Sequence, residues 1–91
     1  MYRLCGKIIK HNKIQESIVI CNDNEKLTHT QKRNICLEEI CYKFDLQNPA
    51  WFDQNEKEYA KFYKTSFGKD NFMEPINFDV LEIEYIPEDK I

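Results

Sequence analysis

The chain has 91 residues, which is enough for one domain and too short for two. Residues 1–50 carry eight basic against six acidic side chains, whereas residues 51–91 carry five against ten, and the net charge is −3. Neither half has the basic excess of an autonomous nucleic-acid-binding domain. Charged and apolar residues are interleaved over residues 1–10, which argues against a signal peptide or membrane span there. We therefore expect a soluble, cytoplasmic protein.

The four cysteines are candidate disulfide or metal ligands, but their spacing favours neither role. Without a secretory signal, reduced thiols packed in the core are expected rather than disulfides. No CxxC pair is present, and Cys36 and Cys41 would lie about 140° apart around a helix, which is a poor arrangement for a shared metal. A zinc site that combines cysteines with His11 or His29 is the alternative.

Residues 2–21 predict a β-hairpin. Residues 2–10 and 14–21 both alternate in the manner of strands, and the polar residues 11–13 between them suit a short turn in which Asn12 tolerates a left-handed backbone. One register keeps most of the isoleucines on one face. It pairs Lys10 with Ile14, Ile8 with Glu16, Gly6 with Ile18 and Leu4 with Ile20.

Residues 28–46 predict a first helix, which is capped by Thr28 or Thr30 and ends at Phe44 or Leu46. One face of about 140° is apolar and would point to the core. It holds Cys36, Leu37, Ile40, Cys41 and Phe44. Ile35, Tyr42 and Leu46 fall on nearly the opposite side. Either the segment around Trp51 or a second helix covers this stripe, or it is exposed for a partner or a second copy.

Residues 53–66 predict a second helix that restarts after Pro49 ends the first. Either Asp53 with Glu56 or Asn55 with Glu58 has the spacing of a capping box. Tyr59, Phe62 and Tyr63 share one face, and Tyr59 and Phe62 are expected to close the core together with Phe67 and Phe72. Lys57, Lys61 and Lys64 form a basic stripe on the other face, which favours a solvated surface.

Residues 76–86 predict a last strand, followed by a loose tail over residues 87–91. The alternation changes phase between Val80 and Leu81, which indicates a bulge or bend near Asp79. Glu82 and Glu84 would complement the outward-facing Arg3 and Lys7 if this strand lies beside the first. The chain therefore predicts an α+β fold of order ββααβ, with a mostly antiparallel three-stranded sheet of order 2-1-3 and two helices on one face.

Nothing in the chain forms a catalytic constellation. Glu82 and Glu84 share strand parity on a charge-alternating strand, where carboxylates face solvent. The two histidines have no nucleophile in register, and no glycine-rich phosphate loop or HExxH motif is present. We expect no catalytic residue, no cofactor and no metal.

Several segments resemble a family of small uncharacterised proteins of low-GC Gram-positive bacteria. These are LEEICYKF, NPAWFDQNEKEY, TSF and FMEPINFDVLEIEYI, together with the N-terminal GKIIK. The likeness covers residues 6–86. It implies a stand-alone bacterial domain, and because that family has no assigned activity, it implies no site residue.

The leading functional hypothesis is a small non-enzymatic protein-interaction or regulatory module. Its candidate surface comprises Ile35, Tyr42, Leu46 and Trp51, and its partner is an unknown protein or a second copy bound at the open sheet edge. A nucleic-acid-associated protein that uses Lys57, Lys61 and Lys64 together with Lys32 and Arg33 is one alternative, although helical geometry sends the three lysines of the stripe away from the aromatic rings. A small enzyme or ligand-binding domain with a pocket lined by Trp51 or Tyr59 is another.

Overall fold

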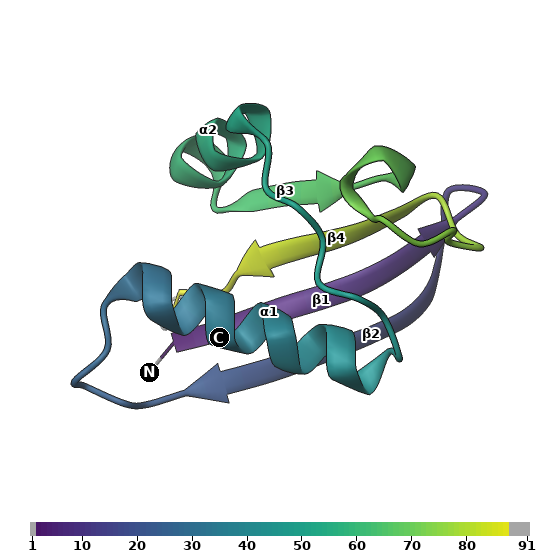
Figure 1. Ribbon diagram of the computed structural model, residues 1–91. Helices are drawn as coiled ribbons and strands as arrows, with labels where there is room; N and C mark the ends of the chain where they lie inside the picture. Colours follow the sequence, from purple (N-terminus) through teal and green to yellow (C-terminus); the bar gives the residue numbers. More distant parts are fainter. Residues whose placement is uncertain (1, 88–91) are drawn as a thin grey trace.

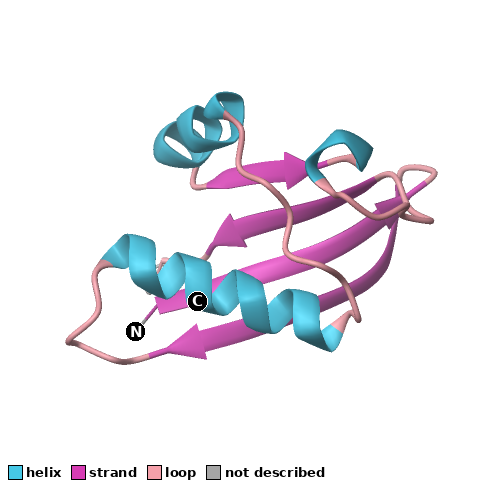
Figure 2. Ribbon diagram, in the orientation of Figure 1, coloured by secondary structure: helices cyan, strands magenta, loops and turns pink. Residues whose placement is uncertain are grey.

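The fold is an antiparallel four-stranded sheet of order β2-β1-β4-β3 with two α-helices (Figures 1 and 2). The computed structural model describes residues 2–87. Its elements are β1 (Tyr2–Lys10), β2 (Lys13–Asn22), α1 (His29–Lys43), α2 (Asp53–Phe62), β3 (Lys64–Phe67), the 3-10 helix η1 (Lys69–Asn71) and β4 (Val80–Tyr85). The predicted α+β class is confirmed. The predicted three strands and the ββααβ order are wrong, because β3 adds a fourth strand.

The β1–β2 hairpin has the predicted register along most of its length. Leu4 faces Ile20, Gly6 faces Ile18 and Ile8 faces Glu16. The pairing of Lys10 with Ile14 is wrong, because the turn is shorter than expected. His11 and Asn12 both have positive φ, at 53° and 62°, as in the tight turns that match strand twist, and Lys10 therefore pairs with Lys13. The pairing shifts between Ile8 and Ile9, which leaves Gln15 as an extra residue on β2.

Helix α1 begins at the predicted cap and ends earlier than predicted. The Gln31 N–H donates to Thr28 Oγ1 over 3.1 Å, and the Thr28 N–H donates to Gln31 Oε1 over 2.8 Å, which satisfies two of the free donors at the helix start. The last helical residue is Lys43, and Asp45 has a left-handed backbone with φ 58°. Of the two predicted ends, Phe44 is the C-cap, one residue beyond the last helical residue, whereas Leu46 is three residues too late.

Strand β3 occupies the segment in which the second helix was expected to continue. Tyr63 stops α2 in a left-handed conformation with φ 58°, and its N–H donates to the Tyr59 carbonyl over 2.9 Å. A left-handed backbone costs a bulky side chain about 1–2 kcal/mol, so no sequence rule places it at a tyrosine. The next four residues pair with β4, with Thr65 facing Ile83 and Phe67 facing Leu81. The predicted helix over residues 53–66 is wrong after Phe62.

Strand β4 lies beside β1, as predicted for the last strand, and Lys7 faces Glu82 across the pair. It begins at Val80, so the predicted strand start at residue 76 is wrong. Of the predicted bulge or bend near Asp79, the bend is confirmed, because the chain bends over residues 77–79. Asp79 also secures the hairpin, because its N–H donates to the Ile9 carbonyl over 2.9 Å and its Oδ2 accepts from the His11 N–H over 2.8 Å. Of the predicted loose tail, residues 88–91 lie outside the described residues.

The core lies between the sheet and the helices, and α1 crosses over β1 and β2 (Figure 1). Its fully buried side chains come from three strands and from α1. They are Leu4, Phe67, Leu81, Ile83, Cys36, Ile40 and Cys41. Helix α1 approaches so closely that a Cβ on Gly6 would stand 2.5 Å from Ile40 Cγ2. Gly6 is therefore needed for space under the helix.

The four cysteines are free thiols in the structure. Cys36 and Cys41 are packed on the core face of α1, and burial raises the pKa of Cys36 to about 11 and that of Cys41 to about 12. Thiols with such pKa values hold their protons at neutral pH, so they behave as small apolar side chains.

Candidate functional site

The predicted stripe on α1 faces away from the core. Ile35 is 44% exposed and Tyr42 is 79% exposed, so neither the segment around Trp51 nor α2 covers them. Leu46 is half-buried and lines one open groove with both of them. The other lining residues are Glu38, Glu39 and Asn48. The groove is thus an apolar strip with two carboxylates beside it.

Trp51 does not line this groove. Its ring is half-buried and lies edge-on to Phe67, with 5.1 Å between ring centroids, and edge-on to Tyr59 at 6.0 Å. The Arg33 guanidinium lies 3.8 Å from the centroid of the Trp51 ring. Trp51 therefore closes the core between the two helices, and the predicted surface retains Ile35, Tyr42 and Leu46.

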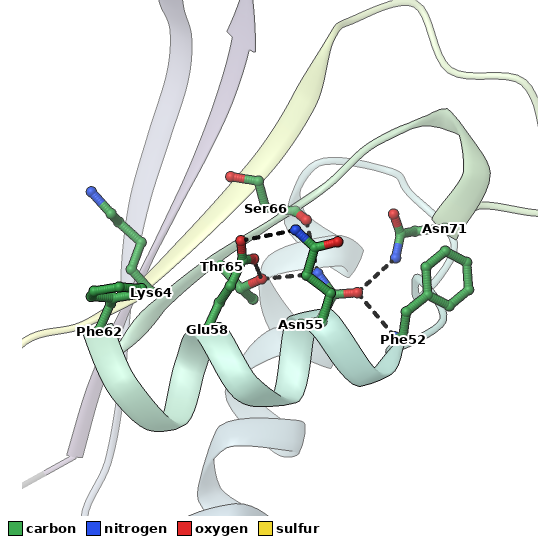
Figure 3. A pocket seen from close by; sticks show the side chains of 9 residues that line it. Phe52, Asn55, Glu58, Phe62, Lys64, Thr65, Ser66 and Asn71 are labelled. Atoms are coloured by element: carbon green, nitrogen blue, oxygen red, sulfur yellow. Dashed lines mark hydrogen bonds between the residues drawn. The ribbon is translucent and has the colours of Figure 1, made fainter.

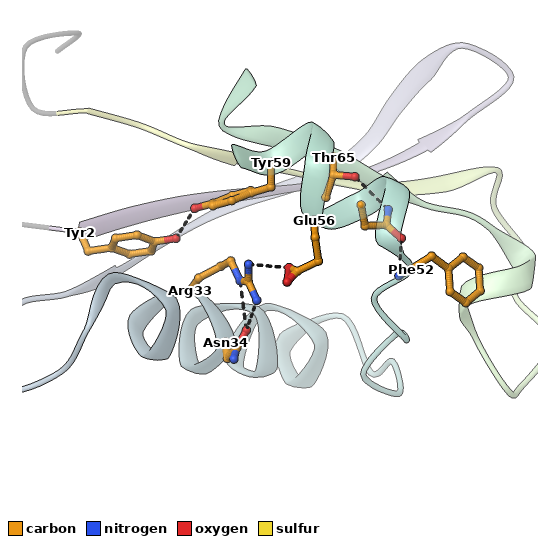
Figure 4. A network of polar contacts seen from close by, with 8 residues as sticks. Tyr2, Arg33, Asn34, Phe52, Glu56, Tyr59 and Thr65 are labelled. Atoms are coloured by element: carbon orange, nitrogen blue, oxygen red, sulfur yellow. Dashed lines mark hydrogen bonds and ion pairs between the residues drawn. The ribbon is translucent and has the colours of Figure 1, made fainter. Parts of the chain in front are cut away.

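Arg33 connects α1 to α2 in a partly buried polar bridge (Figure 4). Its Nη1 donates to Glu56 Oε1 over 2.8 Å, and its Nε and Nη2 donate to Asn34 Oδ1 over 3.1 and 3.0 Å. Only 8% of Arg33 is exposed, and a buried charge is tolerated when it is paired in this way. The sequence contained a signal for this bridge, because Arg33 falls on the helix face of Cys36, Leu37 and Ile40.

A cleft of about 430 Å³ lies beside this bridge and is the kind of concave site that a ligand-binding function requires. Its lining residues are His29, Thr30, Arg33, Glu56, Tyr59, Ala60 and Tyr63. The hydroxyls of Tyr59 and Tyr2 are 2.5 Å apart, and burial raises the pKa of both phenols. Arg33 is engaged with Asn34 and Glu56, and the two phenols with each other, so the buried lining residues Arg33 and Tyr59 already have partners.

His29 packs against tyrosines at the mouth of this cleft. Its ring centroid is 4.9 Å from that of Tyr2 and 5.1 Å from that of Tyr85. Partial burial lowers the pKa of His29, and the positive charges of Arg33 and Lys32 lower it further. The imidazole is therefore neutral at neutral pH in the folded protein.

This environment predicts a pH dependence of stability. Below its ordinary pKa of about 6.5 the unfolded chain protonates His29 before the folded protein does, so acidification favours unfolding. We expect the unfolding free energy of the wild type to fall between about pH 7 and pH 5 more steeply than that of His29→Phe, which keeps a ring there. Urea unfolding at several pH values measures this. Parallel curves for the two proteins would contradict the assignment, since the carboxylates are common to both.

Asn55 anchors α2 to the rest of the fold (Figure 3). Its Oδ1 accepts from the Phe52 N–H over 2.9 Å and from Asn71 Nδ2 over 3.0 Å, and its Nδ2 donates to Thr65 Oγ1 and to the Ser66 carbonyl, each over 2.9 Å. The amide thereby uses two donors and two acceptor sites. Neither predicted capping box is present, because Asn55 bonds back to Phe52.

A groove of about 360 Å³ runs past this network between the exposed rings of Phe52 and Phe62. Glu58 and Lys64 also line it. Thr65 Oγ1 donates to Glu58 Oε1 over 2.7 Å, so this carboxylate is engaged with the protein. As in the cleft at His29, the buried polar groups of the lining, here Asn55 and Thr65, are bonded within the protein.

The predicted basic patch is split between two elements. Lys57 and Lys61 lie on α2, whereas Lys64 lies on β3 opposite Glu84. The prediction that Phe62 closes the core with Tyr59 is wrong, because Phe62 is 60% exposed. Tyr63, which shares the predicted helix face, is 52% exposed. Lys61 Nζ lies 5.3 Å from the centroid of the Phe62 ring, so a ring and a lysine do share this surface.

Comparison with known proteins identified no relative. No protein-family model, curated protein or solved structure matched the chain. The resemblance to small proteins of low-GC Gram-positive bacteria therefore stays a prediction. Within residues 2–87, no helix has the length and apolar character needed to cross a membrane. In the same part of the chain, no three His, Cys, Asp or Glu side chains are grouped in a way that would hold a metal ion.

Proposed function

We propose that this protein is a small, non-enzymatic protein-interaction or regulatory module of the cytoplasm, and that the outward face of α1 is its docking surface. The observation that carries the proposal is the 79% exposure of Tyr42 within a continuous groove that also holds Ile35 and Leu46. Aromatic side chains of this kind supply much of the binding energy of protein interfaces. Contiguous exposed apolar surface on a small domain commonly marks an interaction site.

The charge beside the groove indicates the chemistry of the partner. Glu38 and Glu39 line the groove, and none of its lining residues is basic. A second copy bound through this face would bring the same two carboxylates together, which is unfavourable. A segment that carries apolar residues flanked by lysine or arginine is complementary to both features. We therefore infer that the partner is a basic amphipathic segment of another protein.

The other two function classes have weaker support. The buried polar side chains that line the cleft at His29 and the groove at Glu58, which include Arg33 and Asn55, are paired within the protein, whereas a ligand site keeps buried polar groups for its ligand. For nucleic acid, Lys57 and Lys61 share α2 with Asp53, Glu56 and Glu58, so the helix carries no net positive charge.

Paired substitutions on α1 test the docking surface. We expect the tagged wild-type protein to retain a partner from cells of its source, and Ile35→Ser/Tyr42→Ser to bind that purified partner roughly 30-fold more weakly, since truncating an interface anchor costs about 2 kcal/mol. Calorimetry with the purified partner measures the loss. Binding by the wild type should also weaken with added salt, because salt screens the attraction between the acidic groove and the basic partner segment.

Phe62→Ser provides the matched control, since Phe62 is a similarly exposed ring on another element. It should leave the affinity unchanged. If the α1 variant binds like the wild type, the docking surface is wrong. If the wild type retains RNA or DNA, and replacing Lys57, Lys61 and Lys64 by glutamine releases it, the nucleic-acid alternative replaces the proposal.

A further inference from the structure

The two edges of the sheet are exposed to different degrees. Strand β3 has only four residues, and Asn55 Nδ2 occupies the outward carbonyl of Ser66 over 2.9 Å. Strand β2 has ten residues, and no other strand of residues 2–87 pairs with its outer side. Short and covered edges resist further strand pairing, whereas a long bare edge is a template for it. The open edge of this sheet is therefore β2.

The phase of the hydrogen-bond ladder identifies which groups of β2 point outward. The Ile86 N–H donates to the Arg3 carbonyl over 3.0 Å, so the odd-numbered residues of β1 bond towards β4. Because consecutive residues of an antiparallel strand bond to opposite sides, the even-numbered residues of β1 bond towards β2. Their partners include Ile18 and Ile20, which leaves the backbone groups of Ser17, Val19 and Cys21 directed outward.

The alternation of hydrogen-bond direction can be checked at the other edge strand, β3. On β3, the backbone groups of Thr65 and Phe67 bond towards β4. Those of Ser66, the residue between them, are therefore expected to point to the outer side of β3. The carbonyl that Asn55 contacts there is indeed that of Ser66. The assignment of outward groups on β2 therefore rests on a phase that is consistent across the whole sheet.

We propose that a second copy of this chain pairs antiparallel with β2, about a two-fold axis that passes through Val19. Val19 then faces Val19 of the second copy, and Ser17 faces its Cys21. On the helix side of the sheet, Ile18 faces Ile20 of the second copy, and Glu16 faces its Asn22. The backbone groups that would bond across the axis are those of Ser17, Val19 and Cys21, which are the outward ones.

Three features favour this register. It pairs all of residues 16–22, the regular stretch of β2, and stops before the extra residue Gln15 that disrupts the ladder. It sets no two like charges opposite each other, as a two-fold pairing must avoid. It also covers Val19, which is 48% exposed in the single chain, with another apolar side chain.

The size of this contact predicts a reversible dimer. A seven-residue strand pair is smaller than the roughly 800 Å² per partner of a standard stable interface, so dimerisation should depend on protein concentration. The two-fold axis keeps both copies of α1 on the same face of an eight-stranded sheet. If the proposed docking function holds, the dimer presents two grooves to one side, and a partner with two binding segments gains avidity.

Disulfide trapping tests the register directly, because the native Cys21 supplies one thiol. Facing residues of a hydrogen-bonded pair have Cα atoms about 5.5 Å apart, which suits a disulfide. Ser17→Cys should therefore form a dimer in which the introduced thiol of one copy is linked to the native Cys21 of the other, seen on a non-reducing gel and by mass spectrometry of the linked peptide. We expect it to form roughly tenfold faster than any dimer of Gln15→Cys, whose thiol lacks a facing cysteine. Ser17→Cys/Cys21→Ser should lose this linkage.

Charge exchange at the axis provides a second measurement that does not involve cysteine. Val19→Lys and Val19→Glu each place two like charges face to face, so each variant alone should sediment as a monomer at concentrations where the wild type dimerises. An equimolar mixture of the two should restore the dimer. Circular dichroism checks that both variants fold.

Either of two results would overturn the proposal. One is a wild type that sediments as a monomer up to about 1 mM, well above the range of specific weak dimers. The other is trapping of Gln15→Cys as fast as Ser17→Cys, which would show random collision. Neither result bears on the α1 groove, whose test uses Ile35 and Tyr42, so failure of the dimer and failure of the docking function can be told apart.

Discussion

Replacing Asn55 with alanine is expected to lower the unfolding free energy by about 3 kcal/mol or more, because each buried polar group left without a partner costs about 1–3 kcal/mol. The substitution removes four hydrogen bonds at once and leaves the Ser66 carbonyl and Asn71 Nδ2 each short of one partner. Only 5% of Asn55 is exposed, so water cannot readily replace these bonds. Urea unfolding followed by circular dichroism measures the change.

The melting temperature should fall by roughly 10–25 °C, since a domain of this size loses about 4–8 °C per kcal/mol. Gln54→Ala is the matched control, because Gln54 precedes Asn55 on the same helix, is exposed, and makes only one long contact of 3.4 Å with Glu58. It should change stability by less than about 0.5 kcal/mol. Equal losses for the two variants would show that the network does not hold α2 in place.

The part of the fold that follows from local periodicity could be predicted from the sequence. The hairpin register is specified by the isoleucines, because a slip by one residue would turn them to solvent. The first helix is specified by Thr28 and by the face of Leu37 and Ile40. These features depend only on residues close together in the chain, so a single sequence contains the information.

The part that depends on contacts between distant segments could not be predicted. Strand β3 follows α2 without a glycine, through a left-handed Tyr63, and pairing with β4 stabilises it only after the chain has returned. Helical phase alone assigned Phe62 to the core, although the helix ends there and the ring is 60% exposed. Asn55 shares the face of Tyr59, four residues on, but nothing local reveals that Asn71 and Ser66 will meet it.

The residues of the candidate site also divide into those that local periodicity could place and those that depend on contacts between distant segments. Ile35 and Tyr42 could be placed on the outer face of α1, because both belong to one regular helix. Trp51 could not be placed, since it lies in a connection whose course is set by the Arg33 bridge and by packing on Phe67. The three lysines were grouped on an assumed helix that ends before Lys64.

The second large effect is expected at Gly6, where alanine should lower the unfolding free energy by about 1–3 kcal/mol through overpacking. The added Cβ would stand 2.5 Å from Ile40 Cγ2 and 3.1 Å from its Cδ1. Ile40 has no exposed surface into which it could move. This loss outweighs the roughly 0.5–1 kcal/mol that alanine gains over glycine within a strand. Chemical denaturation of the variant gives the value.

Gly68→Ala separates crowding at Gly6 from the general effect of replacing a glycine. A Cβ on Gly68 would have the Asp79 carbonyl oxygen at 3.8 Å, an ordinary contact, and its φ of −99° suits any residue. Its stability should change by less than about 0.5 kcal/mol. A larger loss at Gly68 than at Gly6 would contradict close approach of α1 as the cause.

A double-mutant cycle with Ile40 assigns the effect to one pair of residues. Ile40→Ala alone should cost about 2–5 kcal/mol, because it opens a cavity under α1. In Gly6→Ala/Ile40→Ala the new methyl group enters that space, so the double variant should be more stable than the sum of the single losses predicts, by about 1 kcal/mol or more. Strict additivity would mean that Gly6→Ala acts through the strand backbone. A favourable coupling would identify Gly6 as the residue that lets α1 lie close to β1.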